Sequence, residues 1–493
     1  MYDLFYKSIE VKQNDLNNLN DDFSTEYYKN LNTQNDSPDN SIQLLSTSDK
    51  IIQYFDQISQ FWKTNDFLNL NQLFQNYNIT IFDDSFDRFE IPELASQTFK
   101  TSDDTIPLIN ILSFLLKLIK VDDRYIMCLL KVDFLNSLFR IYTDVKSCQL
   151  SIQALKCASE MASKNIDLRN NVYLFAVSRI LTSNVLIERF AVYNEIFILI
   201  QTFLSFEIDP QMFDTISEFL ISKISTIISY ITKKKVFDIN NENFDDQVNR
   251  LACENYSYCL ALLSKYPAWT QLFLQKKNDI TKLFIDFLYS KDKIILICTY
   301  FALGKLCENI PIDIQPLVYA IISNLFKYDN LIISYICDTL ISLFRKSDIT
   351  IFKDLLIPII DRLFKLIRNC KFSIKNAIFK TIAFFFYMLP QYLPKAIENG
   401  LFNIIDSMLE MEDRTITLSA LALLSCIFEN EARMGSNKSL RSFIEREGMI
   451  HLKEILESDE KDEEGITNSI YFFLLKYDDF EEIDIQPNPN IYL

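Results

Sequence analysis

The chain has 493 residues, a formal net charge of −17 and 49% hydrophobic residues, including 41 Phe and 24 Tyr. Only five of its residues are glycine, which argues against Rossmann folds, P-loops and β-rich folds, because these need glycine at tight turns. The acidity disfavours binding to nucleic acid, since phosphate backbones are bound by basic surfaces.

The first 104 residues are less regular than the rest of the chain. Residues 1–48 are rich in Asn, Asp and Ser, which predicts a disordered acidic N-terminal arm. Residues 49–104 begin with helical patterns, KIIQYFDQISQFW and DFLNLNQLFQNY, and we expect them to form a helical cap. Within this cap, residues 81–104 predict a loop or a distorted helical unit. The opening MYDLFYKSIE lacks the basic and apolar regions of a signal peptide, so we expect none.

Apolar residues recur at helical spacing from Thr105 onward, which predicts a helical array over residues 105–477. The polar segment DINNENFDDQ predicts a loop at Asp238–Gln247, because Asn and Asp favour turns. Before this loop, helices are expected at Asn171–Ser183, Ile187–Phe206 and Pro210–Lys233. Pro358 lies within DLLIPIIDRLF, where we expect it to kink its helix.

One helix pattern returns four times in the second half of the chain. Its copies are Ile294–Cys307, Leu331–Phe344, Phe372–Phe385 and Thr415–Phe428. Matched positions in these copies are separated by 37, 42 and 42 residues: Leu303, Leu340, Ile382 and Leu424. A period of about 40 residues with two or three helices per unit is typical of an α-solenoid. We therefore predict an all-α, right-handed solenoid of the armadillo or HEAT kind.

The C-terminal end of the array is acidic. A last unit is expected at Arg441–Tyr477, followed by an acidic tail at residues 478–493. Between Glu454 and Asp484 there are twelve acidic residues and only two basic ones. This region is interpreted as solvated surface, with an acidic partner-binding end as the alternative.

The chain offers little that could support catalysis. His451 is the only histidine, and no cysteine or histidine pair has the spacing of a metal site. A Ser–His–Asp or Cys–His device would depend entirely on His451. We therefore expect no enzyme activity, no metal and no cofactor.

The ten cysteines are scattered over apolar helix faces without a CxxC pair. This pattern favours reduced, buried thiols and a cytoplasmic or nuclear location. The longest apolar stretches fall well short of the ~18 residues that span a bilayer, so we expect no membrane association.

Two C-terminal stretches resemble a known family. Asn399–Gly435 is similar to an armadillo repeat, with Gly400 before the helix GLFNIIDSML and an Ala- and Leu-rich helix after it. Phe443–Leu474 resembles the last armadillo repeat of importin-α proteins. That family binds basic nuclear-localisation peptides through Trp and Asn residues that lie four positions apart on successive inner helices.

The Trp–Asn pairs of that family are not found in this sequence. The two tryptophans, Trp62 and Trp269, are followed four residues later by Asp66 and Phe273. Inner-helix pairs at matching positions include Ala422 with Cys426. The resemblance therefore implies the scaffold more directly than the transport role.

We predict a non-enzymatic adaptor that holds protein segments on the concave face of the solenoid. The residues expected to contact partners lie on predicted inner helices: Phe301, Lys305, Asp338, Ser342, Asn376 and Lys380. Partners would be proteins or peptides, including nuclear transport factors if the importin-α resemblance extends to function, and we expect a monomer. The alternative is an armadillo scaffold with a cytoskeletal, signalling or complex-assembly role.

Overall fold

The computed structural model of the chain describes residues 43–144, 147–164, 166–182, 190–233, 244–312, 315–328, 331–347, 353–411, 413–458 and 465–477. It divides into two compact units, which meet between Leu306 and Cys307. We call them the N-terminal unit and the C-terminal unit. The predicted tail at 478–493 and most of the predicted arm at 1–48 lie outside the described residues.

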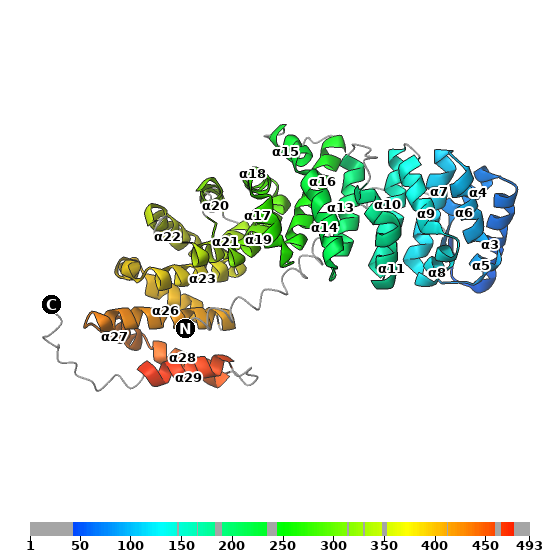
Figure 1. The fold of residues 1–493 in the computed structure, drawn as a ribbon. Coiled ribbons are helices and arrows are strands. Elements are labelled where there is room, and N and C mark those ends of the chain that lie inside the picture. Colours follow the sequence, from blue (N-terminus) through cyan, green and yellow to red (C-terminus); the bar gives the residue numbers. More distant parts are fainter. Residues whose placement is uncertain are drawn as a thin grey trace. The chain divides into compact units, whose positions relative to one another are not determined.

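The N-terminal unit is built from short and long helices and two very short strands (Figure 1). In chain order its elements are β1 (Gln43–Leu45), α3 (Ser48–Lys63), α4 (Phe67–Asn76), β2 (Tyr77–Ile79), α5 (Ser85–Arg88), α6 (Ile91–Thr101), α7 (Thr105–Val121), α8 (Asp123–Lys131), α9 (Phe134–Asp144), α10 (Cys148–Lys164), α11 (Ile166–Val172), the π-helix η2 (Tyr173–Val177), α12 (Ser178–Thr182), α13 (Phe190–Leu204), α14 (Pro210–Ser222), α15 (Ile224–Lys233), α16 (Phe244–Leu263), α17 (Ala268–Gln275) and α18 (Lys277–Leu288).

The next helix, α19 (Lys293–Asn309), contains the boundary between the units. The C-terminal unit then continues with α20 (Gln315–Lys327), α21 (Ile332–Lys346), α22 (Lys353–Ile367), α23 (Phe372–Met388), the 3-10 helix η5 (Pro390–Tyr392), α24 (Leu393–Glu398), α25 (Leu401–Leu409), α26 (Arg414–Arg433), α27 (Lys438–Glu445), α28 (Gly448–Ser458) and α29 (Gly465–Tyr477).

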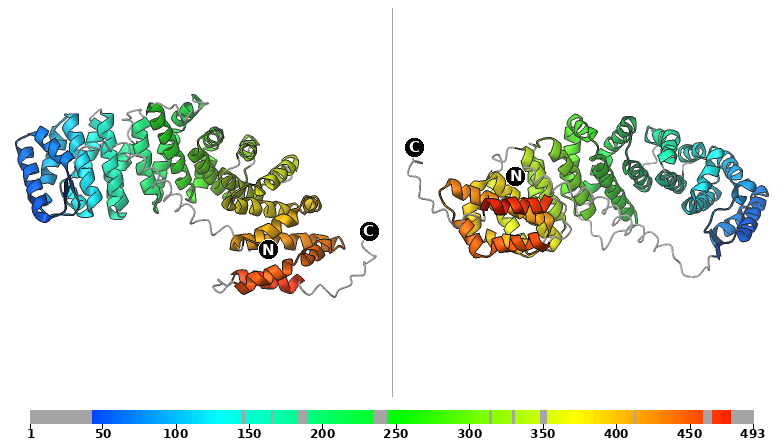
Figure 2. Two further views of the ribbon diagram at one scale, coloured as in Figure 1. Left: turned by 180° about the vertical axis from the view of Figure 1, so that it is seen from behind. Right: turned by 90° about the horizontal axis from the view of Figure 1, so that it is seen from below.

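Within each unit, one long helix of each repeat packs against its counterpart in the next repeat (Figures 1 and 2). We call these the stacking helices. In the N-terminal unit they are α7, α10, α13 and α16, and in the C-terminal unit α21, α23, α26 and α29. Each stacking helix buries apolar surface against both neighbours, so the fold is an all-α, repeat-like array.

Several helices begin where the sequence supplies a capping aspartate. The side chains of Asp209 and Asp413 accept hydrogen bonds of 2.8 and 3.0 Å from the backbone N–H groups of Met212 and Ile416. Such caps satisfy N–H groups that the first turn of a helix leaves unpaired. Pro210 follows Asp209 at a position where a missing N–H does no harm.

The structure differs from the sequence prediction near the N-terminus. Residues 91–101 form the regular helix α6, whereas a loop or a distorted unit was expected there. Glu90, immediately before α6, has a φ of 58° and is therefore in the left-handed region. Glycine usually occupies such a position, so the sequence pattern does not indicate this turn. The last residues of the predicted arm are also ordered, because Gln43–Leu45 pairs in parallel with Tyr77–Ile79.

The structure also bears on the predicted helix at Pro210–Lys233, on the helix that contains Pro358 and on the predicted loop at Asp238–Gln247. The segment Pro210–Lys233 forms two helices rather than one, because α14 ends at Ser222 and α15 begins at Ile224. The helix α22 runs from Lys353 to Ile367 with Pro358 inside it. The predicted loop at Asp238–Gln247 lies mainly outside the described residues, although α16 includes its last residues.

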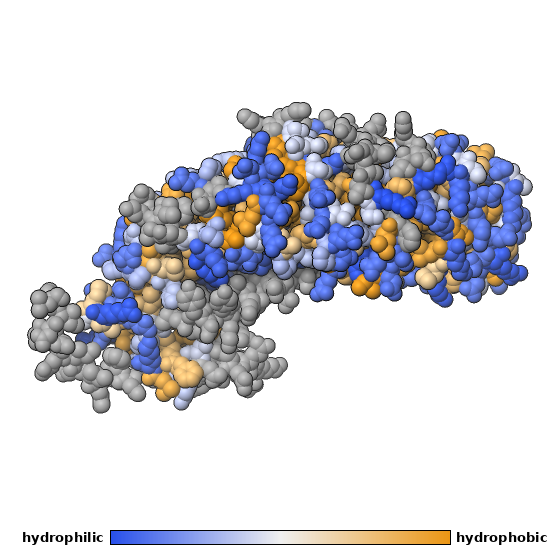
Figure 3. Space-filling view, in the orientation of Figure 1, coloured by the Kyte–Doolittle hydropathy of each residue, from blue (hydrophilic) through white to orange (hydrophobic). Residues whose placement is uncertain are grey.

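The aromatic residues supply much of the core. Trp269 is fully buried, and Phe197 packs edge-on against Tyr256 with ring centroids 5.3 Å apart. The Tyr256 hydroxyl donates a 2.9 Å hydrogen bond to the carbonyl oxygen of Leu220, which satisfies its buried polar atom. Over the visible face of the N-terminal unit, hydrophilic residues alternate with hydrophobic patches (Figure 3). Among the described residues, no helix is both long enough and apolar enough to cross a membrane.

Candidate functional site: the stacking helices and a cation-rimmed pocket

The predicted partner-binding residues of the N-terminal unit lie one turn apart on α19. The ammonium group of Lys305 is 6.0 Å from the ring centroid of Phe301, at the outer limit for a cation–π contact. Both side chains are half-buried. The geometry leaves part of each accessible to a ligand.

The other four predicted residues lie in the C-terminal unit. Asp338 and Ser342 are one turn apart on α21, and Asn376 and Lys380 are one turn apart on the neighbouring helix α23. Ser342 and Lys380 are buried, with only 9% and 6% of their surface exposed. Asp338 and Asn376 are half-buried, so these two are better placed than Ser342 and Lys380 to meet a partner.

Asn376 has one satisfied and one unsatisfied side-chain atom. Its Nδ2 donates a 3.0 Å hydrogen bond to Oγ1 of Thr415 on α26. That hydroxyl in turn donates to a carboxylate oxygen of Asp413 at 2.7 Å. The buried Oδ1 of Asn376 has no hydrogen-bond partner among the described residues. Leaving a buried polar atom unpaired costs free energy, and because this oxygen is buried it is not accessible to a ligand.

The structure also shows a polar cluster that the sequence analysis missed. We call Asn194, Glu195 and Gln201 on α13, together with Asn255 on α16, the amide cluster. Asn255 donates a 2.9 Å hydrogen bond to Oδ1 of Asn194, and Gln201 donates a 2.8 Å hydrogen bond to Oδ1 of Asn255. These bonds connect the two helices within an otherwise apolar contact.

Burial governs the ionisation of Glu195 in this cluster. Removal from solvent raises the pKa of Glu195, while the charge of Lys156 on α10 and the side chain of Asn194 act in the opposite direction. Asn194 donates a 3.3 Å hydrogen bond to Oε1 of Glu195. The carboxyl group is thus held largely by its neighbours, away from solvent.

A second buried cluster, the charged cluster, consists of Arg250 and Glu254 on α16 and Asp292 before α19. The Arg250 guanidinium bonds to the Glu254 carboxylate and lies 3.7 Å from the Asp292 carboxylate. Burial, followed by the nearby Asp292 carboxylate, raises the pKa of Glu254 well above its usual value, and Arg250 counteracts this shift. Asp292 also caps α19, accepting a 2.8 Å hydrogen bond from the N–H group of Ile294.

One sequence signal could have revealed both clusters. The helices containing them read AVYNEIFILIQTF and NRLACENYSYCLALL, where polar residues interrupt long apolar runs. Polar residues at the buried positions of a helix need partners, so paired interruptions on successive repeats predict cross-helix hydrogen bonds.

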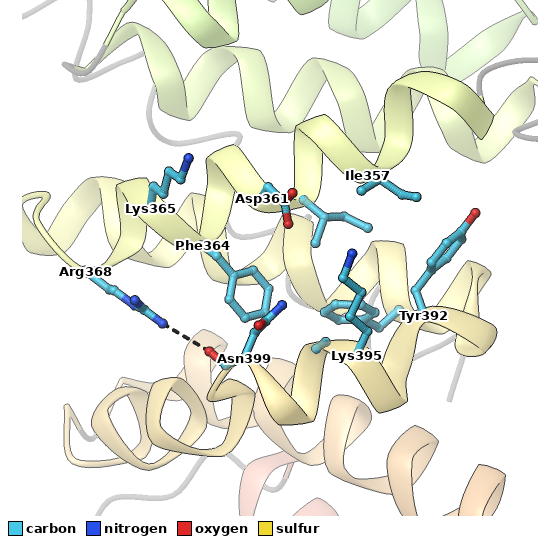
Figure 4. A pocket seen from close by; sticks show the side chains of 11 residues that line it. Ile357, Asp361, Phe364, Lys365, Arg368, Tyr392, Lys395 and Asn399 are labelled. Atoms are coloured by element: carbon cyan, nitrogen blue, oxygen red, sulfur yellow. Dashed lines mark hydrogen bonds between the residues drawn. The ribbon is translucent and has the colours of Figure 1, made fainter.

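A pocket lies between α22 and α24 in the C-terminal unit (Figure 4). It encloses about 240 Å³ and has an aromatic lining of Phe364, Phe386 and Tyr392. Phe364 and Phe386 pack edge-on with ring centroids 6.2 Å apart, and Phe386 is fully buried. The lining therefore presents rigid apolar surface at the bottom of an opening to solvent.

The rim of this pocket is cationic. Lys365 extends from α22, Arg368 from the turn directly after this helix, and Lys395 from α24 (Figure 4). Asp361 is the only carboxylate among the lining residues. A 3.1 Å hydrogen bond runs from Arg368 to the backbone oxygen of Asn399.

The described residues contain no group of three or more His, Cys, Asp or Glu side chains arranged to hold a metal ion. His451 is half-buried on α28, where its Nδ1 lies 3.5 Å from a carboxylate oxygen of Glu454. All ten cysteines are free, and burial raises the pKa of the Cys157 and Cys298 thiols to about 12. Such thiols are poor nucleophiles and poor ligands at neutral pH.

Comparisons with known proteins concern the fold only. No protein-family model matches the chain, and no curated protein matches it. An engineered protein whose crystal structure comes from the Northeast Structural Genomics Consortium matches with a TM-score of 0.60 and 12% identity, covering 86% of this chain and 99% of its own length. A second engineered protein from the same consortium has a TM-score of 0.38 and 13% identity, covering 50% of this chain and 98% of its own. The first likeness supports an all-α, repeat-like fold, and the second is too distant to add to it.

Proposed function

We propose that this chain is a non-enzymatic adaptor that holds segments of other proteins along its stacking helices. The observation that carries the proposal is the succession of stacking helices within each unit, with half-buried polar and aromatic residues on them. Arrays of this kind bury their cores between neighbouring repeats and leave a long face for extended partners. Asp338 and Asn376 on α21 and α23 are the contacts we favour in the C-terminal unit, with Phe301 and Lys305 on α19.

The ligand we favour is an extended peptide or a helix. Asn376 and Phe301 are both half-buried, and the Phe301 ring offers apolar contact to such a ligand. Within the C-terminal unit, Asp338 offers a carboxylate, which would attract a basic or amide-bearing group.

The finer form of the proposal is a right-handed superhelix of armadillo-type repeats. Its support is local and comes from the C-terminal repeats. Gly400, at a φ of 89°, begins α25, and Glu447, at a φ of 61°, precedes α28. Left-handed residues before short helices fit the breaks that the resemblance to armadillo repeats implies.

A narrower version is a diverged transport adaptor similar to importin-α, which is motivated by Phe443–Leu474. Both tryptophans, Trp62 and Trp269, are buried in the core, so neither can sandwich a lysine stem of a bound peptide. Binding of an importin-β-type carrier or an export receptor by the purified chain would support this version. If neither binds, a cytoskeletal, signalling or assembly scaffold becomes the better form of the proposal.

Affinity purification from native cells tests the general proposal. The double variant Phe301→Ala with Asp338→Ala should lose the partners that the unaltered chain captures. A matched control replaces one aromatic and one acidic residue elsewhere, Tyr289→Ala with Glu410→Ala, both exposed. Capture that is unchanged in the first double variant, or equally reduced in both, would contradict the placement of the binding residues.

A further inference from the structure

The pocket between α22 and α24 has a cationic lining, although the chain as a whole is acidic. The whole sequence has a formal net charge of −17, yet three cations and a single carboxylate line this pocket. Neither the Lys365 nor the Lys395 side chain has an ion pair or a hydrogen bond within the described part of the chain. Their charges are therefore not neutralised by neighbouring side chains and are available to an anionic ligand.

The size of the pocket limits what can enter it. About 240 Å³ lies below the roughly 300–1,000 Å³ of typical small-molecule sites. It is suited to one large apolar side chain, which would lie against the Phe364 ring (Figure 4). An aromatic or large aliphatic anchor in an apolar pocket is a common basis for peptide recognition.

The rim determines which residues would flank that anchor. Lys365 and Arg368 come from one side of the opening and Lys395 from the other, so a bound segment would have cations on both flanks (Figure 4). The hydrogen bond to Asn399 involves one terminal nitrogen of Arg368, which leaves other N–H donors of its guanidinium for a carboxylate. Acidic residues on both sides of the anchor would complement this arrangement.

We propose that this pocket binds an acidic segment of a partner protein, with one aromatic or large aliphatic side chain inserted against Phe364 and Tyr392. Carboxylates before and after the anchor would pair with Lys365, Arg368 and Lys395. The pocket lies between α22 and α24, whereas the proposed adaptor contacts lie on α19, α21 and α23, so the two can be altered separately. A nucleic acid is disfavoured because three cations do not make the extended basic surface that phosphate backbones need.

The test uses the full chain and a fluorescein-labelled synthetic peptide in which one phenylalanine is flanked on each side by two glutamates. Fluorescence anisotropy should show saturable binding. The double variant Lys365→Glu with Lys395→Glu should weaken it by about tenfold, since it replaces attraction by repulsion at both flanks. Both lysines are exposed, so folding should be preserved.

Three controls make the outcome decisive. Lys346→Glu with Lys438→Glu changes the total charge equally at exposed positions on α21 and α27, and should leave binding unchanged. A peptide with alanine in place of phenylalanine should bind about tenfold more weakly. Equal losses in both double variants, equal binding of the alanine peptide, tighter binding of a single-stranded oligonucleotide, or no saturable binding would each overturn the proposal.

Discussion

The two units use similar stacking helices but place their polar groups differently. In the N-terminal unit, the polar side chains of the amide cluster and of the charged cluster bond to partners within their own cluster, as Asn255 does to Asn194. In the C-terminal unit, the cationic side chains of the pocket are exposed, and those of Lys365 and Lys395 have no ion pair or hydrogen bond among the described residues.

This difference separates two roles of polar side chains in a helical array. A buried polar group that is fully paired holds two helices in one register, because any shift would break its bonds. An exposed cation without a partner contributes little to stability and keeps its charge for a ligand. We therefore expect substitutions in the N-terminal clusters to affect folding and those at the pocket rim to affect binding.

The largest expected effect comes from replacing the arginine of the charged cluster. Arg250→Met leaves the carboxylates of Glu254 and Asp292 buried without their cation, which should lower the free energy of unfolding by roughly 3–5 kcal/mol. The comparison predicts a much smaller effect for Arg368→Met, because Arg368 is exposed at the pocket rim.

Hydrogen exchange by mass spectrometry would measure both substitutions. Faster exchange in α16 and α19 is expected for Arg250→Met alone. Similar losses of protection from the two variants would show that buried and exposed arginines contribute alike, which would break the comparison.

A smaller effect is expected from the amides. Asn255→Ala removes side-chain bonds to Asn194 and Gln201 and leaves the buried Oδ1 of Asn194 without this partner, which should cost about 1–3 kcal/mol. Asn376→Ala removes a single hydrogen bond and also an unpaired oxygen, so it should cost less. Urea denaturation followed by circular dichroism would rank the two, and a reversed ranking would contradict the role given to the amide cluster.

The smallest expected effect is a pH dependence. Burial raises the pKa of Glu195 above its usual 4.5 in the folded chain. Below pH 4.5 the Glu195 carboxyl group is protonated in both the folded and the unfolded chain. As the pH rises, the unfolded chain loses this proton first, so the free energy of unfolding falls until the folded carboxyl group also ionises. Glu195→Gln cannot ionise and should avoid this loss.

Thermal unfolding at two pH values would show the difference. The gain from Glu195→Gln should be near zero at ~pH 4 and positive, by a few degrees at most, at ~pH 8. Glu410→Gln provides an exposed control, for which no such trend is expected. A gain of equal size at both pH values would mean that packing, rather than ionisation, explains the effect.

Some features of the fold could be predicted from local patterns. The apolar spacing around Leu340 and Leu424 predicted helices that the structure forms as α21 and α26. The turn before α6 could not be predicted, because Glu90 adopts a left-handed conformation that its residue type rarely takes. The burial of Lys380 could not be predicted from the sequence either, because a lysine on a helix is expected to reach solvent.

The sequence by itself determined the helical array, because the spacing of apolar residues and the scarcity of glycine act within single helices and their connections. Only the tertiary structure decided which polar residues meet. Asn194 and Asn255 are 61 positions apart, and Phe364 and Phe386 come from different helices, so their contacts depend on how successive repeats pack. Packing also decided that Lys365 and Lys395 converge on one opening, because residues distant along the chain become neighbours only when the helices that carry them do.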